Sequence, residues 1–336
     1  GDTMDYIIKG DVYESTGEMD INIVLEDDAG MYQFFNESVA YDLIGALESG
    51  GLQHIDGVAP AIREVATVLE PVSKNSAPSA YIFAYDADHT VNDLRGTDGS
   101  AITRDLMVDG MTVVNEDLAG SLDVEAGDTI VVYPKNAAPL TLVVSAVAAD
   151  EGMGAWRFAD LLFVDLAYAQ EEVFAAPSMI NAVDVSCEGA MQDGYLVTDE
   201  AIMELRDEIP GGPDYTYDAV KRSGVEQAES LADMISQLFV LMSSFTIIAG
   251  VALIVNIFVM LAEERKPEMG ISRAVGMQRG DLTQSFVFEG VVYALMASAA
   301  GTFVGLVIAF VMINAFSAVM GGGGMEFTLH FEWESL

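Results

Sequence analysis

An uncharged run over residues 234–262 constrains this chain more than any other feature of its sequence. The run contains no Asp, Glu, Lys or Arg, and its apolar centre, residues 238–261, would extend about 36 Å as a helix. The hydrocarbon core of a bilayer is about 30 Å thick, and a buried helix of a soluble protein rarely stays uncharged on every face. The sequence therefore predicts a transmembrane helix over 238–261.

A second uncharged run covers residues 290–325. We expect its membrane-spanning part to be residues 290–320, because the four glycines at 321–324 would break the helix, and residues 321–336 would begin an extracytoplasmic loop. Small side chains recur at every fourth position and would let another helix approach closely. We interpret them as a helix-packing face, which consists of Ala297, Gly301, Gly305 and Ala309.

The connection between these runs, residues 262–289, indicates the orientation of the chain. It holds four of the 14 basic residues, namely Arg265, Lys266, Arg273 and Arg279. Basic residues in a short loop favour the cytoplasmic side of a membrane. The sequence thus predicts a multi-pass protein of the cell membrane, with residues 1–237 extracytoplasmic and residues 262–289 cytoplasmic.

The part of the chain before the first run is strongly acidic. Residues 1–233 carry 45 of the 53 acidic side chains but only 10 of the 14 basic ones. Concentrated salt would screen the resulting self-repulsion, so we interpret the excess as salt adaptation and expect a halophilic archaeon as the source. The alternative is a domain that binds cations or basic partners. Nucleic-acid binding is disfavoured, because no basic patch would neutralise phosphates.

The acidic part is predicted to be an α+β domain over residues 1–218. Apolar alternation predicts strands, and three-four spacing predicts helices. We expect strands at 5–12, 20–25, 80–85, 129–133 and 140–147, the last two as a hairpin, and helices at 35–48 and 199–207. A proline- and glycine-rich break at 210–213 would end the domain. A helical stalk over 219–237 would then lead into the first membrane helix.

No residue set predicts an enzyme. His54, His89 and His330 are isolated from one another, and neither HExxH nor GxSxG occurs. Asp86 and Asp88 could hold a hard cation, but their segment lacks the glycine and distal glutamate of a calcium loop, so we predict neither a metal site nor a catalytic residue. No lysine follows a glycine, which excludes a Walker-type phosphate loop in this sequence. The one cysteine, Cys187, cannot form an internal disulfide.

The basic connection also has the pattern of a short helix. Pro267 suits a first helical turn, Gly276 can end the helix after about two turns, and Asp281 can cap the helix that follows. A short helix on the cytoplasmic surface between two membrane helices would offer a soluble partner something to push on. The alternative is a basic turn that only fixes topology.

The ordered residues of this connection resemble the FtsX/MacB-like permease family of ABC transporters, in which E-R-R-x-E-x-G-I-x-R-A-x-G is typical and a further glutamate follows about a dozen residues later. The matching residues are Glu264, Arg265, Lys266, Glu268, Gly270, Ile271, Arg273, Ala274, Gly276, Glu289 and Gly290. Lys266 stands where arginine is common. Residues 114–119, Leu122 and residues 127–130 are similar to the family's periplasmic core domain.

The resemblance implies a function and a set of partners. The chain would be the permease subunit of an ATP-driven ABC transport system, whose outer domain handles a lipid, lipoprotein, peptide or drug. It would bind no cofactor itself, because a separate ABC ATP-binding subunit would bind ATP and Mg and hydrolyse the ATP. A second permease copy or half and the lipid membrane complete the expected partners. The residues implied to couple to the ATPase are Glu264, Arg265, Glu268, Met269, Gly270, Arg273, Ala274 and Gly276.

Two further expectations follow from the resemblance. The family has a membrane helix before the outer domain and another after the second run, so we expect a sequence truncated at both ends that contains two of four helices. Some relatives transmit force to an external enzyme, so an FtsX-like signalling subunit is the alternative to transport. An anchored external enzyme is a third and less favoured hypothesis.

Overall fold

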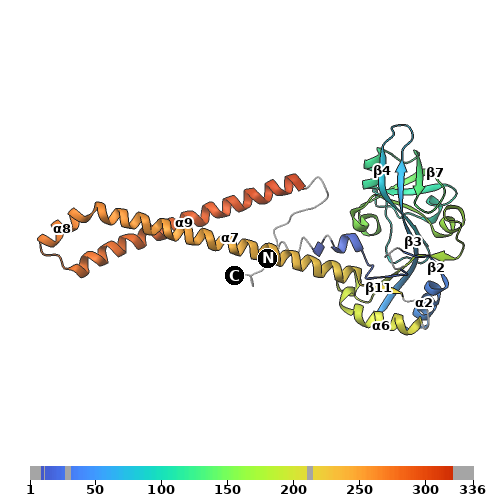
Figure 1. The fold of residues 1–336 in the computed structure, drawn as a ribbon, viewed down its shortest axis with the longest axis horizontal. Coiled ribbons are helices and arrows are strands. Elements are labelled where there is room, and N and C mark those ends of the chain that lie inside the picture. The colour runs from blue at the N-terminus through green and yellow to red at the C-terminus, as the bar shows by residue number, and fades with distance from the viewer. Residues whose placement is uncertain (1–8, 11, 27–31, 210–214, 321–336) are drawn as a thin grey trace. The chain divides into compact units, whose positions relative to one another are not determined.

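The computed structural model describes residues 9–10, 12–26, 32–209 and 215–320 (Figure 1). These residues form two compact units, one ending at Ser230 and the other beginning at Leu231. We call the first the globular unit and the second the helical unit, and we describe each by itself.

The globular unit is built on a nine-stranded sheet within the described residues, with the order β11-β1-β10-β3-β4-β8-β5-β7-β6. Its strands are β1 (Ile21–Val24), β3 (Ile55–Leu69), β4 (Ser76–Tyr85), β5 (Met111–Asn115), β6 (Thr129–Pro134), β7 (Leu140–Ala148), β8 (Leu161–Asp165), β10 (Ala182–Cys187) and β11 (Thr216–Asp218). The short strands β2 (Phe35–Asn36) and β9 (Met179–Ile180) pair separately.

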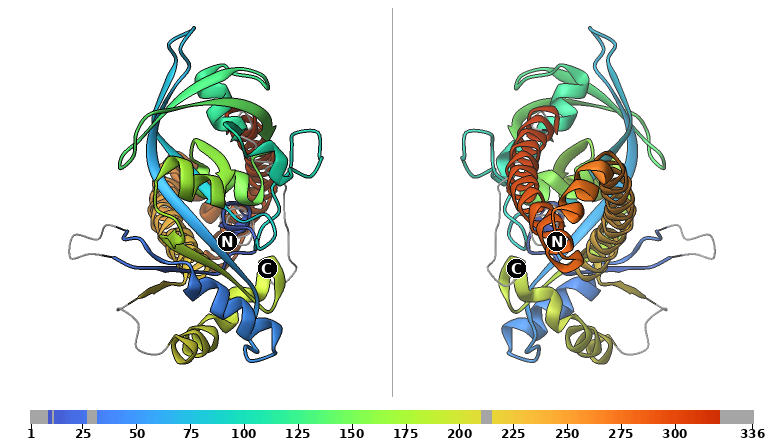
Figure 2. Two further views of the ribbon diagram at one scale, coloured as in Figure 1. Left: turned by 90° about the vertical axis from the view of Figure 1, so that its right-hand side faces the viewer. Right: turned by 90° about the vertical axis from the view of Figure 1, so that its left-hand side faces the viewer.

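Strand β3 joins the two halves of this sheet. Its first residues pair with β10, and its last residues pair with β6, while β4 follows most of its length. The pairing of β3 with β6 closes a cycle of six strands, β3-β4-β8-β5-β7-β6. Figure 1 shows β3 running from the lobe with β4 and β7 to the lobe with β11, α2 and α6, and Figure 2 shows the same long strand from two further sides.

Apolar side chains bury both faces of the sheet. One cluster contains buried residues of the six-stranded cycle together with buried residues of three helices. These helices are α2 (Ser38–Glu48), α3 (Glu116–Leu122) and α6 (Thr198–Glu208). A second cluster gathers Phe83, Phe163 and Trp156, whose rings meet at tilted or edge-on angles. In β6, Ile130 and Val132 alternate with more exposed residues, as expected of a strand with one buried face.

Shorter helical segments connect the strands of the globular unit. They are α4 (Leu166–Tyr168), α5 (Ala190–Asp193), the 3₁₀ helices η1 (Arg104–Leu106), η2 (Gly152–Phe158) and η4 (Gly194–Val197), and the π-helical turn η3 (Ala169–Val173). Residues 9–10 and 12–16 are helical as well.

The structure confirms most of the predicted elements. The strands predicted at 20–25, 80–85, 129–133 and 140–147 correspond to β1, β4, β6 and β7, and β6 and β7 pair as the predicted antiparallel hairpin. The helix predicted at 199–207 is α6. The break predicted at 210–213 lies outside the described residues.

Two predicted elements are wrong in part. The strand predicted at 5–12 is helical at residues 9, 10 and 12, and its other residues lie outside the described ones. The helix predicted from residue 35 begins only at Ser38, because Phe35 and Asn36 pair with Ile180 and Met179. In both places long-range packing overrides the local pattern.

The helical unit consists of long helices. Helix α7 (Val220–Glu264) begins in the globular unit and continues into this one, α8 (Lys266–Ala274) follows after one residue, and α9 (Arg279–Met320) completes the described chain. By length and composition, α7 and residues Arg279–Ile308 of α9 are each apolar enough to cross a membrane.

Candidate functional site

Helix α8 has the ends that the sequence predicts. Pro267 lies in its first turn, where the missing N–H of proline breaks no helical hydrogen bond. At the other end, Gly276 has a φ of +110°, and the N–H of Met277 reaches the carbonyl of Ser272 at 3.1 Å. An L side chain rarely adopts that φ, so the turn out of α8 depends on glycine.

Helix α8 and the turn after it expose apolar side chains. Ile271 is 66% exposed, Val275 85% and Met277 48%. Arg273 is also exposed and makes no ion pair with any residue that the structure describes. The segment therefore presents apolar surface beside an unpaired cation, which is a composition suited to contact with another protein.

The beginning of α8 is tied to α9. The guanidinium of Arg265, the residue that precedes α8, donates hydrogen bonds of 2.6 and 3.0 Å to the two carboxylate oxygens of Glu289. The hydroxyl of Tyr293 donates to the same carboxylate at 3.3 Å. The neighbouring Lys266 faces Glu263 at 3.6 Å. The carboxylate of Glu289 thus has a bidentate partner in Arg265.

At the residue after Glu289, α7 and α9 approach each other closely. A Cβ added to Gly290 would lie 3.1 Å from the ring of Phe258. The ring of Phe258 also meets that of Phe286 edge-on, with the centroids 6.2 Å apart. The glycine that follows Glu289 in the sequence pattern therefore makes room for an aromatic ring of α7.

The structure places the coupling residues of the sequence prediction on one short segment. Arg265 and Met269 are half-buried, whereas the remaining ones are exposed, namely Glu264, Glu268, Gly270, Arg273, Ala274 and Gly276. This arrangement is compatible with a partner-binding surface, and their role in docking stays a prediction.

The small-residue face of α9 is open. Ala297, Gly301 and Gly305 are exposed, and a Cβ built on either glycine meets nothing within 4 Å. The side chain of Ala309 lies outside the described ones. No described residue packs against Gly301 or Gly305, so the prediction that a helix packs there remains a prediction.

The other candidates from the sequence do not form a site. His89 contacts Asp86 at 2.8 Å, and His54 contacts Glu204 at 2.7 Å, each from a different part of the globular unit. Across the described residues, no group of three His, Cys, Asp or Glu side chains could hold a metal ion. His330 lies outside them. Cys187 is buried, and burial together with Asp20 raises the pKa of its thiol to about 12.

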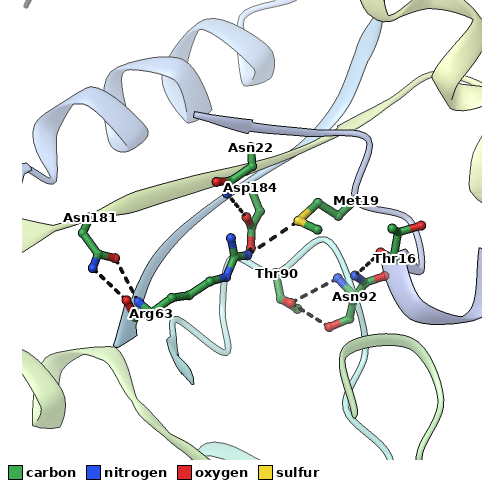
Figure 3. A network of polar contacts seen from close by, with 8 residues as sticks. All are labelled: Thr16, Met19, Asn22, Arg63, Thr90, Asn92, Asn181 and Asp184. Atoms are coloured by element: carbon green, nitrogen blue, oxygen red, sulfur yellow. Dashed lines mark hydrogen bonds and ion pairs between the residues drawn. The ribbon is translucent and has the colours of Figure 1, made fainter. Parts of the chain in front are cut away.

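Sequence reasoning missed a buried polar network in the sheet. Arg63 on β3 forms an ion pair with Asp184 on β10, and Asn22 on β1 donates to that carboxylate at 2.8 Å (Figure 3). The Arg63 guanidinium lies 4.5 Å from the Phe83 ring centroid, a distance typical of cation–π contact. Arg63 and Asn22 are each more than 100 residues from Asp184 in the sequence, so no local pattern could reveal these contacts.

By length and composition α7 and α9 are apolar enough to cross a membrane, and the short helix α8 lies between them in the sequence. Residues 240–336 match the family model described as the FtsX-like permease C-terminal domain. Over these residues the chain is similar to FtsX-like permeases, and ABC transporter permeases of the MacB kind are among its relatives.

Individual relatives are similar over smaller parts of the chain. A macrolide export ATP-binding/permease protein MacB of Chromobacterium violaceum is 30% identical over 118 residues, which cover 34% of this chain and 18% of that protein. An uncharacterized ABC transporter permease protein of Mycobacterium tuberculosis is 22% identical over 195 residues, covering 58% of this chain and 21% of its own length. The chain thus spans about a fifth of the length of these relatives.

Solved structures with similar chains were also found. The periplasmic region of MacB from Actinobacillus actinomycetemcomitans aligns with a TM-score of 0.43 at 15% identity, covering 69% of this chain and 98% of that one. The extracellular domain of the transporter YknZ from Gram-positive bacteria aligns with a TM-score of 0.37 at 15% identity, covering 59% and 98%.

Proposed function

We propose that this chain is a permease subunit of an ABC transport system and that α8 is the surface on which a separate ATPase docks. The observation that carries the proposal is α8 with the turn after it, which lies between two long apolar helices and exposes Ile271, Val275 and Arg273, a cation with no ion-pair partner among the described residues. Such a surface is costly to leave in water, and a partner with an apolar groove and a carboxylate would cover it.

Coupling in this proposal follows the contacts of the helical unit. Pressure on α8 reaches α7 directly, because one residue separates the two helices. It reaches α9 through the bidentate contact of Arg265 with Glu289. Closure of the ATPase on ATP would therefore move both apolar helices together. ATP and Mg would be bound by the partner.

We further propose that residues 1–237 lie outside the cytoplasm and that the substrate is an amphipathic compound such as a lipid, lipoprotein, peptide or drug. The basic loop supports this orientation, and relatives are described as export proteins for macrolides and, in Pseudomonas syringae, for syringafactin. A second permease copy would supply a helix for the open face at Gly301 and Gly305.

The experiment measures docking and transport together. The full chain is co-expressed with an ABC ATPase of the same organism, purified and reconstituted into vesicles. Arg273→Glu and Val275→Asp should each lower ATPase co-purification and stimulation by tenfold or more, about the effect of losing one central contact. Arg279→Glu, a charge reversal at an exposed, unpaired position outside α8, is the matched control.

Each result has a defined meaning. Full binding and stimulation by the α8 variants would overturn the docking assignment. Intact docking without ATP-dependent movement of substrate in vesicles, accompanied by activation of an external enzyme, would replace transport with signalling.

A further inference from the structure

The first turns of α7 are an integral part of the globular unit. Lys221, Val225 and Ala228 are 0%, 2% and 3% exposed, and their spacing puts them on one face of the helix. Just before α7, strand β11 pairs antiparallel with β1. The start of α7, the helix that continues into the helical unit, is therefore packed at the edge of the sheet.

A fully buried ion pair lies at the start of α7. The ammonium of Lys221 is 2.8 Å from the carboxylate of Asp20, and both side chains are 0% exposed. The other carboxylate oxygen of Asp20 accepts the N–H of Cys187 on β10 at 2.8 Å. Asp20 directly precedes β1, so the pair connects α7 to two strands of the sheet.

The surroundings of Asp20 leave little room for another arrangement. A Cβ added to Gly194 would lie 2.4 Å from the carboxylate, so the loop there packs directly on the charge. Burial raises the pKa of the Asp20 carboxyl, and the charge of Lys221 opposes that rise. Removing ions from water is unfavourable, and apolar residues of equal volume often stabilise a fold as well or better. A charged pair buried in this way has most value for selecting one arrangement of α7 on the sheet.

A second helical segment holds the same part of α7. The ammonium of Lys9 lies 2.7 Å from the carboxylate of Glu229, and a Cβ on Gly224 would be 2.8 Å from Val12. The carbonyl of Thr16, at the end of this segment, accepts a hydrogen bond from Asn92 at 3.1 Å. The helical residues 9–10 and 12–16 and the first turns of α7 are thus fixed side by side within the globular unit.

We propose that the Asp20–Lys221 pair is a registration lock, which allows α7 to move only as one body with β1 and β10. Apolar contacts such as that of Val225 tolerate sliding and rotation, whereas a buried ion pair has one favourable geometry. The movement of α7 by a docked ATPase rests on the proposed function. The lock itself does not, because it is a property of the globular unit.

The test measures how many positions α7 adopts on the sheet. Spin labels are attached to the full chain at Gln192→Cys and Ser230→Cys, two exposed positions of the globular unit, and their distance distribution is recorded by pulsed electron spin resonance. The labelled chain with the native Asp20–Lys221 ion pair should give one narrow distribution of distances between the spin labels. The Asp20→Leu/Lys221→Met double variant should fold with similar stability but show added populations displaced by up to about 5 Å, one helical turn.

A surface pair on the same turn provides the matched control. Arg222→Gln removes ion pairs with Asp199 and Glu226, and it should leave the distribution narrow. A distribution in the double variant as narrow as in the native chain would overturn the proposal, because the pair would then contribute stability alone.

If the double variant does not fold, Lys221→Gln is measured instead, and a narrow population there would be equally decisive against the lock. The measurement needs no ATPase, so its failure is distinguishable from failure of the docking proposal.

Discussion

Arg265 and Glu289 are 24 residues apart in the sequence and meet through two hydrogen bonds of 2.6 and 3.0 Å. Arg265 immediately precedes α8 and Glu289 lies within α9, so their contact closes the loop that contains α8. The chain joins the end of α8 to α9, and this contact fixes the start of α8 to α9 as well. In the proposed function, α8 would therefore act on both long helices.

Breaking this contact should loosen α8. Arg265→Gln and Glu289→Gln are each expected to lower the free energy of unfolding of the helical unit only modestly, because the pair is bidentate but partly exposed. Faster amide exchange over residues 266–274 of the full chain in nanodiscs would report the change. The exchanged pair Arg265→Glu/Glu289→Arg should recover much of the protection, and no recovery would mean that the ion pair itself is not the cause.

Gly290 should be sensitive to size. Gly290→Leu forces a side chain against Phe258, whose ring is already 3.1 Å from the position of a Cβ. Overpacking of this kind costs about 1–3 kcal/mol, which a lower melting temperature of the full chain would reveal. Phe258→Ala in the same chain should relieve the clash. Gly250→Leu in α7 is the control, since a Cβ there meets nothing within 4 Å, and an equal loss in both glycine variants would contradict the contact.

Local patterns predicted the helical unit well, because its features are local. Charge-free length predicts α7 and α9, and Pro267 and Gly276 predict the ends of α8. The globular unit is different. Strand β3 contains Pro60 and has three pairing partners, and nothing in its own residues indicates so long a strand.

The same limit applies to the buried charges. Asp20 and Lys221 are about 200 residues apart in the sequence. In a chain with 53 acidic side chains, the sequence does not indicate which carboxylate is buried. Only the fold distinguishes it from the solvated ones. The strand prediction is wrong at residues 9, 10 and 12 for a related reason, since Lys9 and Val12 contact α7, and the segment's own sequence does not indicate these contacts.

Asp150 should make the globular unit less stable as the pH rises. Burial and the nearby Asp117 and Glu116 raise the pKa of this carboxyl to about 6, from 3.8. The folded state therefore holds the proton more tightly than the unfolded state, and the stability due to it is lost between about pH 4 and pH 6. Asp150→Asn should raise the free energy of unfolding above pH 6 by about 1 kcal/mol or less, because the site is partly solvated, and should have no benefit near pH 3.

Urea unfolding of the full chain at several pH values would test this, and added salt should shrink the effect by screening the neighbouring carboxylates. Asp98 is the control of opposite sign. Hydrogen bonds from Ser100 lower the pKa of its carboxyl, so Asp98→Asn should reduce stability at neutral pH and change little in acid. A benefit of Asp150→Asn that is the same at every pH would point to packing rather than to charge.

Cys187 makes the proposed orientation directly measurable. The thiol is 1% exposed, and its pKa of about 12 leaves almost no thiolate at neutral pH, so the native chain should not react with maleimides. Single cysteines placed at Gln192 in the globular unit and at Gln278 after α8, both exposed positions, can then be compared without removing the native cysteine. In intact cells a membrane-impermeant maleimide should label Gln192→Cys, and it should label Gln278→Cys only after the membrane is permeabilised. The reverse pattern would place α8 outside the cell, where no ATPase could reach it, and the docking proposal would fail with it.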